Sequence, residues 1–176
     1  MTFIWVTLAV STAVIGLVSR SEEPPSTVQG ASLRVALLMP IYNESPSEVF
    51  GNAAAMLADL TTNGDAHSFD LFVLSDSRDE GIAAAEWQAF QALRAAAPEN
   101  MSVYYRRRAA NTDKKVGNLV DWITGWGATY EAMIVLDADS LMTGRAIARL
   151  TQEMSADPES GLIQSCLLYT SDAADE

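Results

Sequence analysis

From Leu33 onward, short apolar runs alternate with segments in which an apolar residue recurs every three or four positions. The runs predict buried strands, and the segments between them predict amphipathic helices. Strands are expected at residues 33–39, 69–74, 101–105, 133–136 and 161–164, with helices beginning near residues 46, 79, 114 and 143. This alternation predicts an α/β fold with a doubly wound, mainly parallel sheet and right-handed crossovers.

Local signals place the first strand end and two helix faces. Pro40 is expected to close the first strand, because proline cannot donate to the ladder of a central strand. Ser45 and Glu48 have the spacing of a capping box, with Pro46 at the first helical position. The core-facing residues of that helix are expected to be Val49, Ala53, Met56, Leu57 and Leu60. Those of the next helix are expected to be Ile82, Ala85, Ala89 and Leu93.

Charge and rare residues exclude several classes of function. The 176 residues suffice for one domain, and 23 acidic against 11 basic residues give a net charge of −12, which argues against nucleic acid as a partner. Five of the basic residues fall within residues 106–115, and this basic segment predicts a small anionic ligand. One cysteine, Cys166, and one histidine, His67, exclude a disulfide framework and a Cys/His zinc site within one chain. His67 lies in a loop where we expect it to be solvated.

The first nineteen residues carry no charge and are mostly apolar. A helix of that length is roughly 28 Å long, enough to cross a bilayer, so residues 1–19 predict a transmembrane helix. A signal peptide is disfavoured because no Lys or Arg precedes the apolar run, and a start within a longer protein is a third interpretation. Arg20 favours a cytoplasmic exit, and residues 20–32 are polar with Pro and Gly, as in a linker.

Two carboxylates, Asp137 and Asp139, directly follow the predicted strand at residues 133–136. Ligands of open α/β sheets bind at the carboxyl ends of the strands. Carboxylate oxygens together with substrate phosphates complete the coordination shell of Mg²⁺ or Mn²⁺. The pair therefore predicts a divalent metal bound with a diphosphate, although an acidic loop of no function would have the same pattern.

Polar residues also follow the three preceding strands. They are Tyr42 and Glu44, then Asp76, and then Lys114 and Lys115 at the start of a helix. Asp76 could equally be a helix N-cap, and the lysines a solvated helix start. Cations at that position oppose the helix dipole, so a nearby anion explains them better. Four successive strand ends with such residues favour a ligand site over four structural coincidences.

These residues lie within motifs that resemble those of a known family. In order, the motifs occupy residues 34–44, 74–77, 105–108, 115–118 and 135–140. They resemble the processive family 2 glycosyltransferases, and most of all the membrane glucosyltransferases that make the β-glucan backbone of osmoregulated periplasmic glucans. The similarity runs from about Arg34 to Ser165. Cellulose and hyaluronan synthases share Asp76 and the Asp-Ala-Asp element but are less similar at residues 105–118.

The resemblance implies a GT-A fold that takes UDP-glucose as donor and a glucan as acceptor. Matched motif by motif, it implies that Tyr42 and Glu44 line the uridine pocket and that Asp76 binds the uracil or the ribose. Lys115 would lie against the diphosphate. Asp137 and Asp139 would hold the metal, Mg²⁺ or Mn²⁺, and the sugar-phosphate, with Asp139 the firmer metal ligand.

The family's general-base motif, its acceptor-site motif and its later membrane helices have no counterpart in this sequence. The resemblance therefore implies a truncated donor half at residues 33–165, with no catalytic base and at most weak binding of UDP-glucose. Residues 166–176 do not continue the family pattern and are expected to be a non-native tail. The implied location is the bacterial inner membrane, with the domain on its cytoplasmic side and the bilayer as a partner.

Three other classes compete with this interpretation. A sugar nucleotidyltransferase would carry a Gly-rich basic loop after the first strand, where this chain has residues 40–44, Pro-Ile-Tyr-Asn-Glu. A receiver-like signalling domain would place its phospho-acceptor Asp at the end of the third strand, where this chain has Tyr105 and Arg106. A non-catalytic, membrane-anchored α/β domain stays open as the third alternative.

Overall fold

The computed structural model of the protein describes residues 30–63 and 66–164. The predicted transmembrane helix at residues 1–19, most of the predicted linker at 20–32 and the predicted tail at 166–176 lie outside the described residues. Within the described ranges, no helix is both long enough and apolar enough to cross a membrane.

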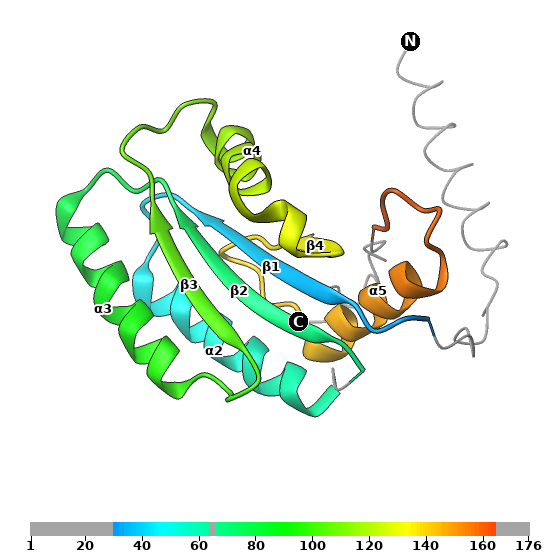
Figure 1. Ribbon diagram of the computed structural model, residues 1–176. Coiled ribbons are helices and arrows are strands. Elements are labelled where there is room, and N and C mark those ends of the chain that lie inside the picture. Colours follow the sequence, from blue (N-terminus) through cyan, green and yellow to red (C-terminus); the bar gives the residue numbers. More distant parts are fainter. Residues whose placement is uncertain (1–29, 64–65, 165–176) are drawn as a thin grey trace, which may run out of the picture.

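Four parallel strands form one sheet in the order β3-β2-β1-β4 (Figure 1). They are β1 (Arg34–Ile41), β2 (Ser68–Ser75), β3 (Ser102–Arg107) and β4 (Ala132–Val135). Each pairs in parallel with its neighbours, which confirms the predicted parallel sheet. All four carboxyl ends therefore meet at one edge, where the polar residues that follow them are brought together.

Helices cover both faces of this sheet (Figure 1). On one face lie α2 (Pro46–Asn63), α3 (Glu80–Ala96) and α5 (Gly144–Ala156), with α2 packed between the other two. On the other face lies α4 (Lys114–Trp126), which continues into the 3₁₀ turn η1 (Gly127–Thr129). Helices on both faces confirm the doubly wound α/β arrangement.

Each face has its own apolar core. The larger core lies beneath α2, α3 and α5, and it buries all five residues predicted for the first helix, namely Val49, Ala53, Met56, Leu57 and Leu60. The smaller core packs Trp122 of α4 against Leu38 and Phe72, with the Phe72 and Trp122 ring centroids 5.1 Å apart. These two cores hold the strands in the register that sets the shape of the carboxyl edge.

The buried face predicted for α3 is confirmed at Leu93 but wrong at Ala85, which is exposed. The helix also buries Ala83, Glu86 and Phe90, which were not predicted. The Phe90 ring stacks on Tyr105 of β3 at a centroid distance of 5.6 Å. Because Phe90 offers more apolar area than the alanines, its packing turns this side of the helix inward.

Pro40 does not end the first strand, because β1 continues to Ile41. The Leu38 carbonyl accepts from Leu136 on the β4 side, and the Ile41 carbonyl accepts from Asp76 on the β2 side. Backbone groups alternate between the two neighbours, so the Pro40 nitrogen points toward the β4 side beyond the last residue of β4. No ladder hydrogen bond is required there, and proline is tolerated.

Two expectations for the end of the chain are also wrong. The run at 133–136 is not a fully buried strand, because Met133 and Val135 are 44% and 41% exposed. The reason is position: β4 is the edge strand of the described sheet, and α4 packs over the strands beside it. Residues 161–164, expected to be a fifth strand, form no strand, and residues 162–164 line the groove beside β4.

The contact between α2 and α5 depends on a glycine. A Cβ at Gly144 would overlap the backbone of Asp59 and Leu60, whereas a Cβ at Gly51 would meet nothing. Gly144→Ala is expected to lower the free energy of unfolding by about 1–3 kcal/mol through overpacking. Gly51→Ala, the matched control inside α2, should raise it by about 0.5–1 kcal/mol. Urea unfolding of both variants checks this, and a stabilising Gly144→Ala would contradict it.

Candidate functional site

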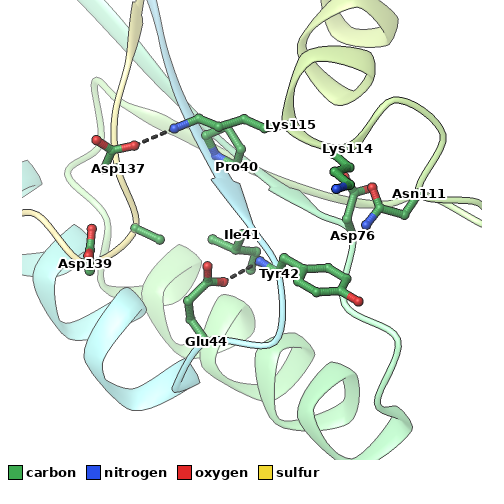
Figure 2. Close-up of a pocket in the computed structure, with 11 residues that line it drawn as sticks. Pro40, Ile41, Tyr42, Glu44, Asp76, Asn111, Lys114, Lys115, Asp137 and Asp139 are labelled. Atoms are coloured by element: carbon green, nitrogen blue, oxygen red, sulfur yellow. Dashed lines mark hydrogen bonds and ion pairs between the residues drawn. The ribbon is translucent and has the colours of Figure 1, made fainter.

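A cleft of about 620 Å³ lies at the carboxyl edge of the sheet (Figure 2). That volume suits a ligand of nucleotide size. All six predicted site residues line it, and the full lining is Pro40, Ile41, Tyr42, Glu44, Asp76, Asn111, Lys114, Lys115, Asp137, Ala138 and Asp139. The structure therefore brings together side chains that are separated by up to about 100 residues of sequence, as the strand-end argument predicts.

The turn after β1 presents Tyr42 and Glu44 to the cleft. It bends at Asn43, which has a left-handed φ of 57°, a conformation that asparagine tolerates better than most residues. The Asn43 N–H donates to the Ser77 hydroxyl at 2.8 Å, and its side-chain oxygen accepts from the Arg78 N–H at 3.0 Å. The Glu44 carboxylate in turn accepts from the backbone N–H of Tyr42. These bonds fix the turn to the loop after β2.

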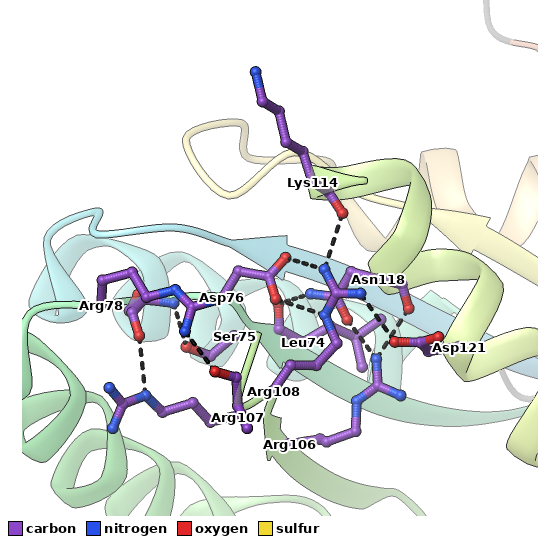
Figure 3. A network of polar contacts seen from close by, with 12 residues as sticks. Leu74, Ser75, Asp76, Arg78, Arg106, Arg107, Arg108, Lys114, Asn118 and Asp121 are labelled. Carbon is purple, nitrogen blue, oxygen red and sulfur yellow. Dashed lines mark hydrogen bonds and ion pairs between the residues drawn. The ribbon is translucent and has the colours of Figure 1, made fainter. Parts of the chain in front are cut away.

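Asp76 is buried at the end of β2 and is held by Arg108. The Arg108 guanidinium donates to both carboxylate oxygens, at 2.7 and 2.8 Å, and its own side chain is only 8% exposed. Arg108 also donates to Asp121 at 2.9 Å and to the Lys114 carbonyl at 3.1 Å (Figure 3). The hydrogen bonds that Arg108 donates to Asp76 are the main cause of the raised pKa of Arg108. Arg108 thereby joins the end of β2 to α4 at two places, Lys114 at the start of the helix and Asp121 further along it.

Asp76 is consequently not a helix N-cap, the alternative left open by the sequence. The N-cap of α3 is Asp79, whose carboxylate accepts from the Ile82 N–H at 2.9 Å. Because Asp79 caps α3, Asp76, three residues before it, has no capping role. Its carboxylate faces the cleft and Arg108 instead.

The structure divides the basic segment at residues 106–115 into two parts (Figure 3). Arg106 donates to Asn118 on α4, and Arg107 donates to Glu80 at 2.8 Å and to the Ser77 carbonyl at 2.9 Å. With Arg108 on Asp76, the arginines bind groups of the protein itself. The two lysines that follow line the cleft and are its basic side chains.

The start of α4 places these lysines. Asp113 and Lys114 have left-handed φ values of 54° and 51°, so the chain turns sharply into the helix. A Cβ at Gly117 would overlap the Thr112 carbonyl, which shows how closely this turn packs on the helix. The amino end of α4 therefore brings both lysines to the cleft, where their positive charges favour an anion.

Asp137 and Asp139 lie at the β4 end of the cleft (Figure 2). Lys115 forms an ion pair with Asp137, and the two side chains are 49% and 64% exposed. Asp139 is exposed and has no hydrogen-bond or ion-pair partner among the described residues. In the described ranges, no group of three or more His, Cys, Asp or Glu side chains gathers in a way that could hold a metal. A metal on these two carboxylates would thus need oxygens from a substrate to complete its shell.

A buried carboxylate behind the cleft was missed by the sequence argument. Glu86 is 1% exposed and accepts from the hydroxyls of Ser75 at 2.7 Å, Tyr105 at 2.8 Å and Ser77. Burial, with the bond to Glu86 contributing, raises the pKa of Tyr105 to about 12. Because Ser77 also accepts from Asn43, Glu86 supports the turn that carries Tyr42. The sequence did carry one signal of this burial: Glu86 has the helical spacing of the apolar residues Phe90 and Leu93.

Glu86→Ala is expected to lower the free energy of unfolding by about 2–4 kcal/mol. It removes the acceptor of three hydroxyl groups, two of them from buried serines, and leaves a cavity. Glu80→Ala is the matched control on the same helix, since Glu80 is 83% exposed and solvent screens its bond to Arg107, so we expect a much smaller loss. Chemical unfolding of the two variants checks the difference, and equal losses would contradict the support role of Glu86.

Comparison with known proteins finds that the chain is similar to part of several glucosyltransferases. It is 43% identical over 166 residues to a glucans biosynthesis glucosyltransferase H of Shewanella sp. (strain ANA-3), and 44% identical over 171 residues to that of Caulobacter vibrioides (strain NA1000 / CB15N). The chain is homologous to part of this glucosyltransferase family. These matches cover 93% of the chain but only 23% and 26% of the relatives, so the chain spans about a quarter of their length. They confirm the resemblance drawn from the motifs.

Solved structures extend the comparison to the fold. The chain superposes with a TM-score of 0.51 and 16% identity on a mannosyltransferase of Pyrobaculum calidifontis, solved in complex with GDP-Man and Mn²⁺. The match covers 76% of this chain and 36% of the mannosyltransferase. The shared α/β architecture fits a GT-A-like fold. No protein-family model matches the chain.

Proposed function

We propose that this chain carries the donor-binding part of a membrane glucosyltransferase that transfers glucose from UDP-glucose to a growing β-glucan, the backbone of a periplasmic glucan. The observation that carries the proposal is one cleft that joins the Asp137 and Asp139 carboxylates, the Lys114 and Lys115 ammonium groups and the Tyr42 ring. A nucleotide sugar needs these three chemistries together: metal ligands, phosphate-binding cations and a surface for a base. Similarity to part of named glucosyltransferases supports glucose as the sugar.

The residues of the β4 end fit a divalent metal. Asp137 and Asp139 offer the hard oxygen ligands that Mg²⁺ and Mn²⁺ prefer, and the diphosphate of the donor would supply the rest of the shell. A mannosyltransferase of similar fold is known with GDP-Man and Mn²⁺, which supports a metal-bound donor. When bound, the metal would neutralise the charge that develops on the leaving diphosphate.

The remaining residues would bind the other parts of the donor. Lys115 would leave Asp137 for the diphosphate, since a bound cation would replace it as the partner of that carboxylate. Tyr42 and Glu44 would line the uridine pocket, and Asp76 would accept from the uracil or the ribose. Asp76 and Tyr42 are held in place before any ligand arrives, through Arg108 and the Asn43 turn. Such preorganisation lowers the cost of binding.

The domain plan accompanies this proposal. Residues 33–165 would form the GT-A donor half, preceded by a transmembrane helix at 1–19 and a linker at 20–32, and followed by a non-native tail at 166–176. The base that activates the glucan acceptor would come from outside this segment, which agrees with a match to only a quarter of the relatives' length. The domain would face the cytoplasm at the bacterial inner membrane, because nucleotide sugars are made there.

Donor selectivity tests the proposal. The full chain is titrated calorimetrically with UDP-glucose, ADP-glucose and GDP-mannose in the presence of Mn²⁺, with its fold checked by far-UV circular dichroism. UDP-glucose is expected to bind at least about tenfold more tightly than the other two, a difference of about 1.4 kcal/mol. Equal affinities, or a preference for GDP-mannose, would contradict UDP-glucose as the donor.

A further inference from the structure

We propose that Asn118 is a positioning residue: it holds the amino half of α4 on the sheet and thereby fixes the place of Lys115 in the cleft. The inference rests on the proposed function, which assigns Lys115 to the diphosphate. Asn118 does not line the cleft. It lies on α4 three residues after Lys115 and acts through that lysine.

The first observation is the burial of an amide on a helix that buries little else. The helix α4, described over its whole length, has two buried residues, Asn118 and Trp122. Asn118 is 0% exposed. A polar side chain in such a place is unfavourable unless its hydrogen bonds are made within the protein. We therefore asked which groups satisfy it.

Asn118 bonds to two strands of the sheet (Figure 3). Its side-chain N–H donates to the Leu74 carbonyl at 2.9 Å, near the carboxyl end of β2. Arg106 of β3 donates to the Asn118 backbone carbonyl at 2.9 Å and also to its side-chain oxygen. The amide thus attaches α4 to the edge of the sheet at which the cleft lies. Buried hydrogen bonds of this kind fix a geometry as well as contributing stability.

The second observation is that apolar packing holds only the later part of α4. Trp122 packs against Phe72, with ring centroids 5.1 Å apart. Before Asn118, by contrast, no apolar residue of this helix is buried, and Val116 is 68% exposed. The half of α4 that carries the lysines is therefore held by polar contacts.

The third observation is the direction in which Asn118 and Lys115 point. Residues three apart lie on the same side of a helix. The bond from Arg108 to the Lys114 carbonyl fixes where α4 begins, and the bond from Asn118 to Leu74 fixes which side of the helix faces the sheet. Together they direct Lys115 across the cleft to Asp137, with which it forms an ion pair.

A fixed helix matters because the lysine itself is flexible. The Lys115 side chain is 49% exposed and has four rotatable carbons, so binding an anion must order it. If its backbone also moved, the loss of conformational freedom on binding would be larger. Asn118 removes that second cost, and its loss should weaken the binding of a diphosphate.

A double-variant cycle with pyrophosphate tests the inference. The affinity of pyrophosphate with Mn²⁺ is measured calorimetrically for the full chain, for Asn118→Leu, for Lys115→Ala and for the double variant. We expect Asn118→Leu and Lys115→Ala each to weaken binding about tenfold. The double variant should bind no more weakly than Lys115→Ala alone, because Asn118 acts through the lysine.

Trp122→Leu is the matched control, since it places the same residue at the other buried position of the helix. It removes more apolar packing and should cost more stability, yet it keeps the Asn118 bonds, so pyrophosphate affinity should stay within about twofold. Asn118→Ser, which is too short to reach Leu74 and adds no bulk, should repeat the tenfold loss even if the leucine variant does not fold. Far-UV circular dichroism checks the fold of each variant.

Three results would overturn the inference: undiminished pyrophosphate affinity in the folded Asn118 variants, an equal loss in Trp122→Leu, or additive losses in the double variant. Selective binding of UDP-glucose by the unsubstituted chain would uphold the proposed function in each of these cases. Failure of the folded, unsubstituted chain to bind either UDP-glucose or pyrophosphate would instead overturn the proposed function, and this inference with it.

Discussion

Arg108→Met is expected to lower the free energy of unfolding by about 3–5 kcal/mol. The substitution keeps much of the aliphatic stem but removes the guanidinium from both oxygens of Asp76, a residue only 3% exposed. A carboxylate left buried without a partner accounts for most of the cost. The same change frees Asp121 and the Lys114 carbonyl, so the start of α4 should loosen and the cleft lose affinity for its ligand. Urea unfolding measures the first effect and ligand titration the second.

Two further variants test whether the loss comes from the Asp76 ion pair or would follow the removal of any arginine from residues 106–108. Arg107→Met removes a neighbouring guanidinium that pairs with an exposed Glu80, and we expect a much smaller loss of stability than for Arg108→Met. Combining Arg108→Met with Asp76→Asn should recover part of the lost stability, because no buried charge then remains unpaired. Similar losses for both arginines, or no recovery in the double variant, would show that the Asp76 ion pair is not the cause.

Asp139→Asn is expected to weaken Mn²⁺-dependent nucleotide binding by about 100-fold. Asp137 forms an ion pair with Lys115, whereas Asp139 has no cation beside it among the described residues. Removal of one of two side-chain ligands leaves the metal dependent on substrate oxygens and water, and a loss of this size corresponds to about 2.7 kcal/mol. Electron paramagnetic resonance of Mn²⁺, with and without UDP, measures free against bound metal.

Asp157→Asn provides the matched control for that experiment. Asp157 is exposed at the end of α5, outside the cleft, and it undergoes the same loss of one negative charge. Mn²⁺ binding should match that of the unsubstituted chain. A comparable fall in both variants would mean that the overall charge of −12, and not the Asp139 carboxylate, attracts the metal.

The order of elements and the membership of the cleft could be predicted from the sequence. Periodicity located the strands and helices, and a parallel sheet then necessarily brings Tyr42, Asp76, Lys115 and Asp137 to one edge. Pro40 shows where such rules end. Whether β1 tolerates a proline at position 40 depends on which neighbouring strand the Pro40 nitrogen faces. That in turn depends on the strand order and on the residue at which β4 ends.

The pairing of charges within the site could not be predicted in the same way. Arg108 meets Asp76 across 32 residues because β3 runs beside β2, and the sequence offers three adjacent arginines with no sign of which one turns inward. Glu86 was missed because the burial of a glutamate depends on the hydroxyls of Ser75 and Tyr105, which come from two other elements.

Calorimetric titration of the folded chain with UDP-glucose, first with Mn²⁺ and then with excess EDTA, tests the central claim most directly. A nucleotide sugar held through a metal on Asp137 and Asp139 should bind measurably with Mn²⁺, and its affinity should fall by at least about tenfold once the metal is removed. Equal affinity in Mn²⁺ and in EDTA, or no binding of UDP-glucose in either, would contradict a metal-dependent donor site in this cleft.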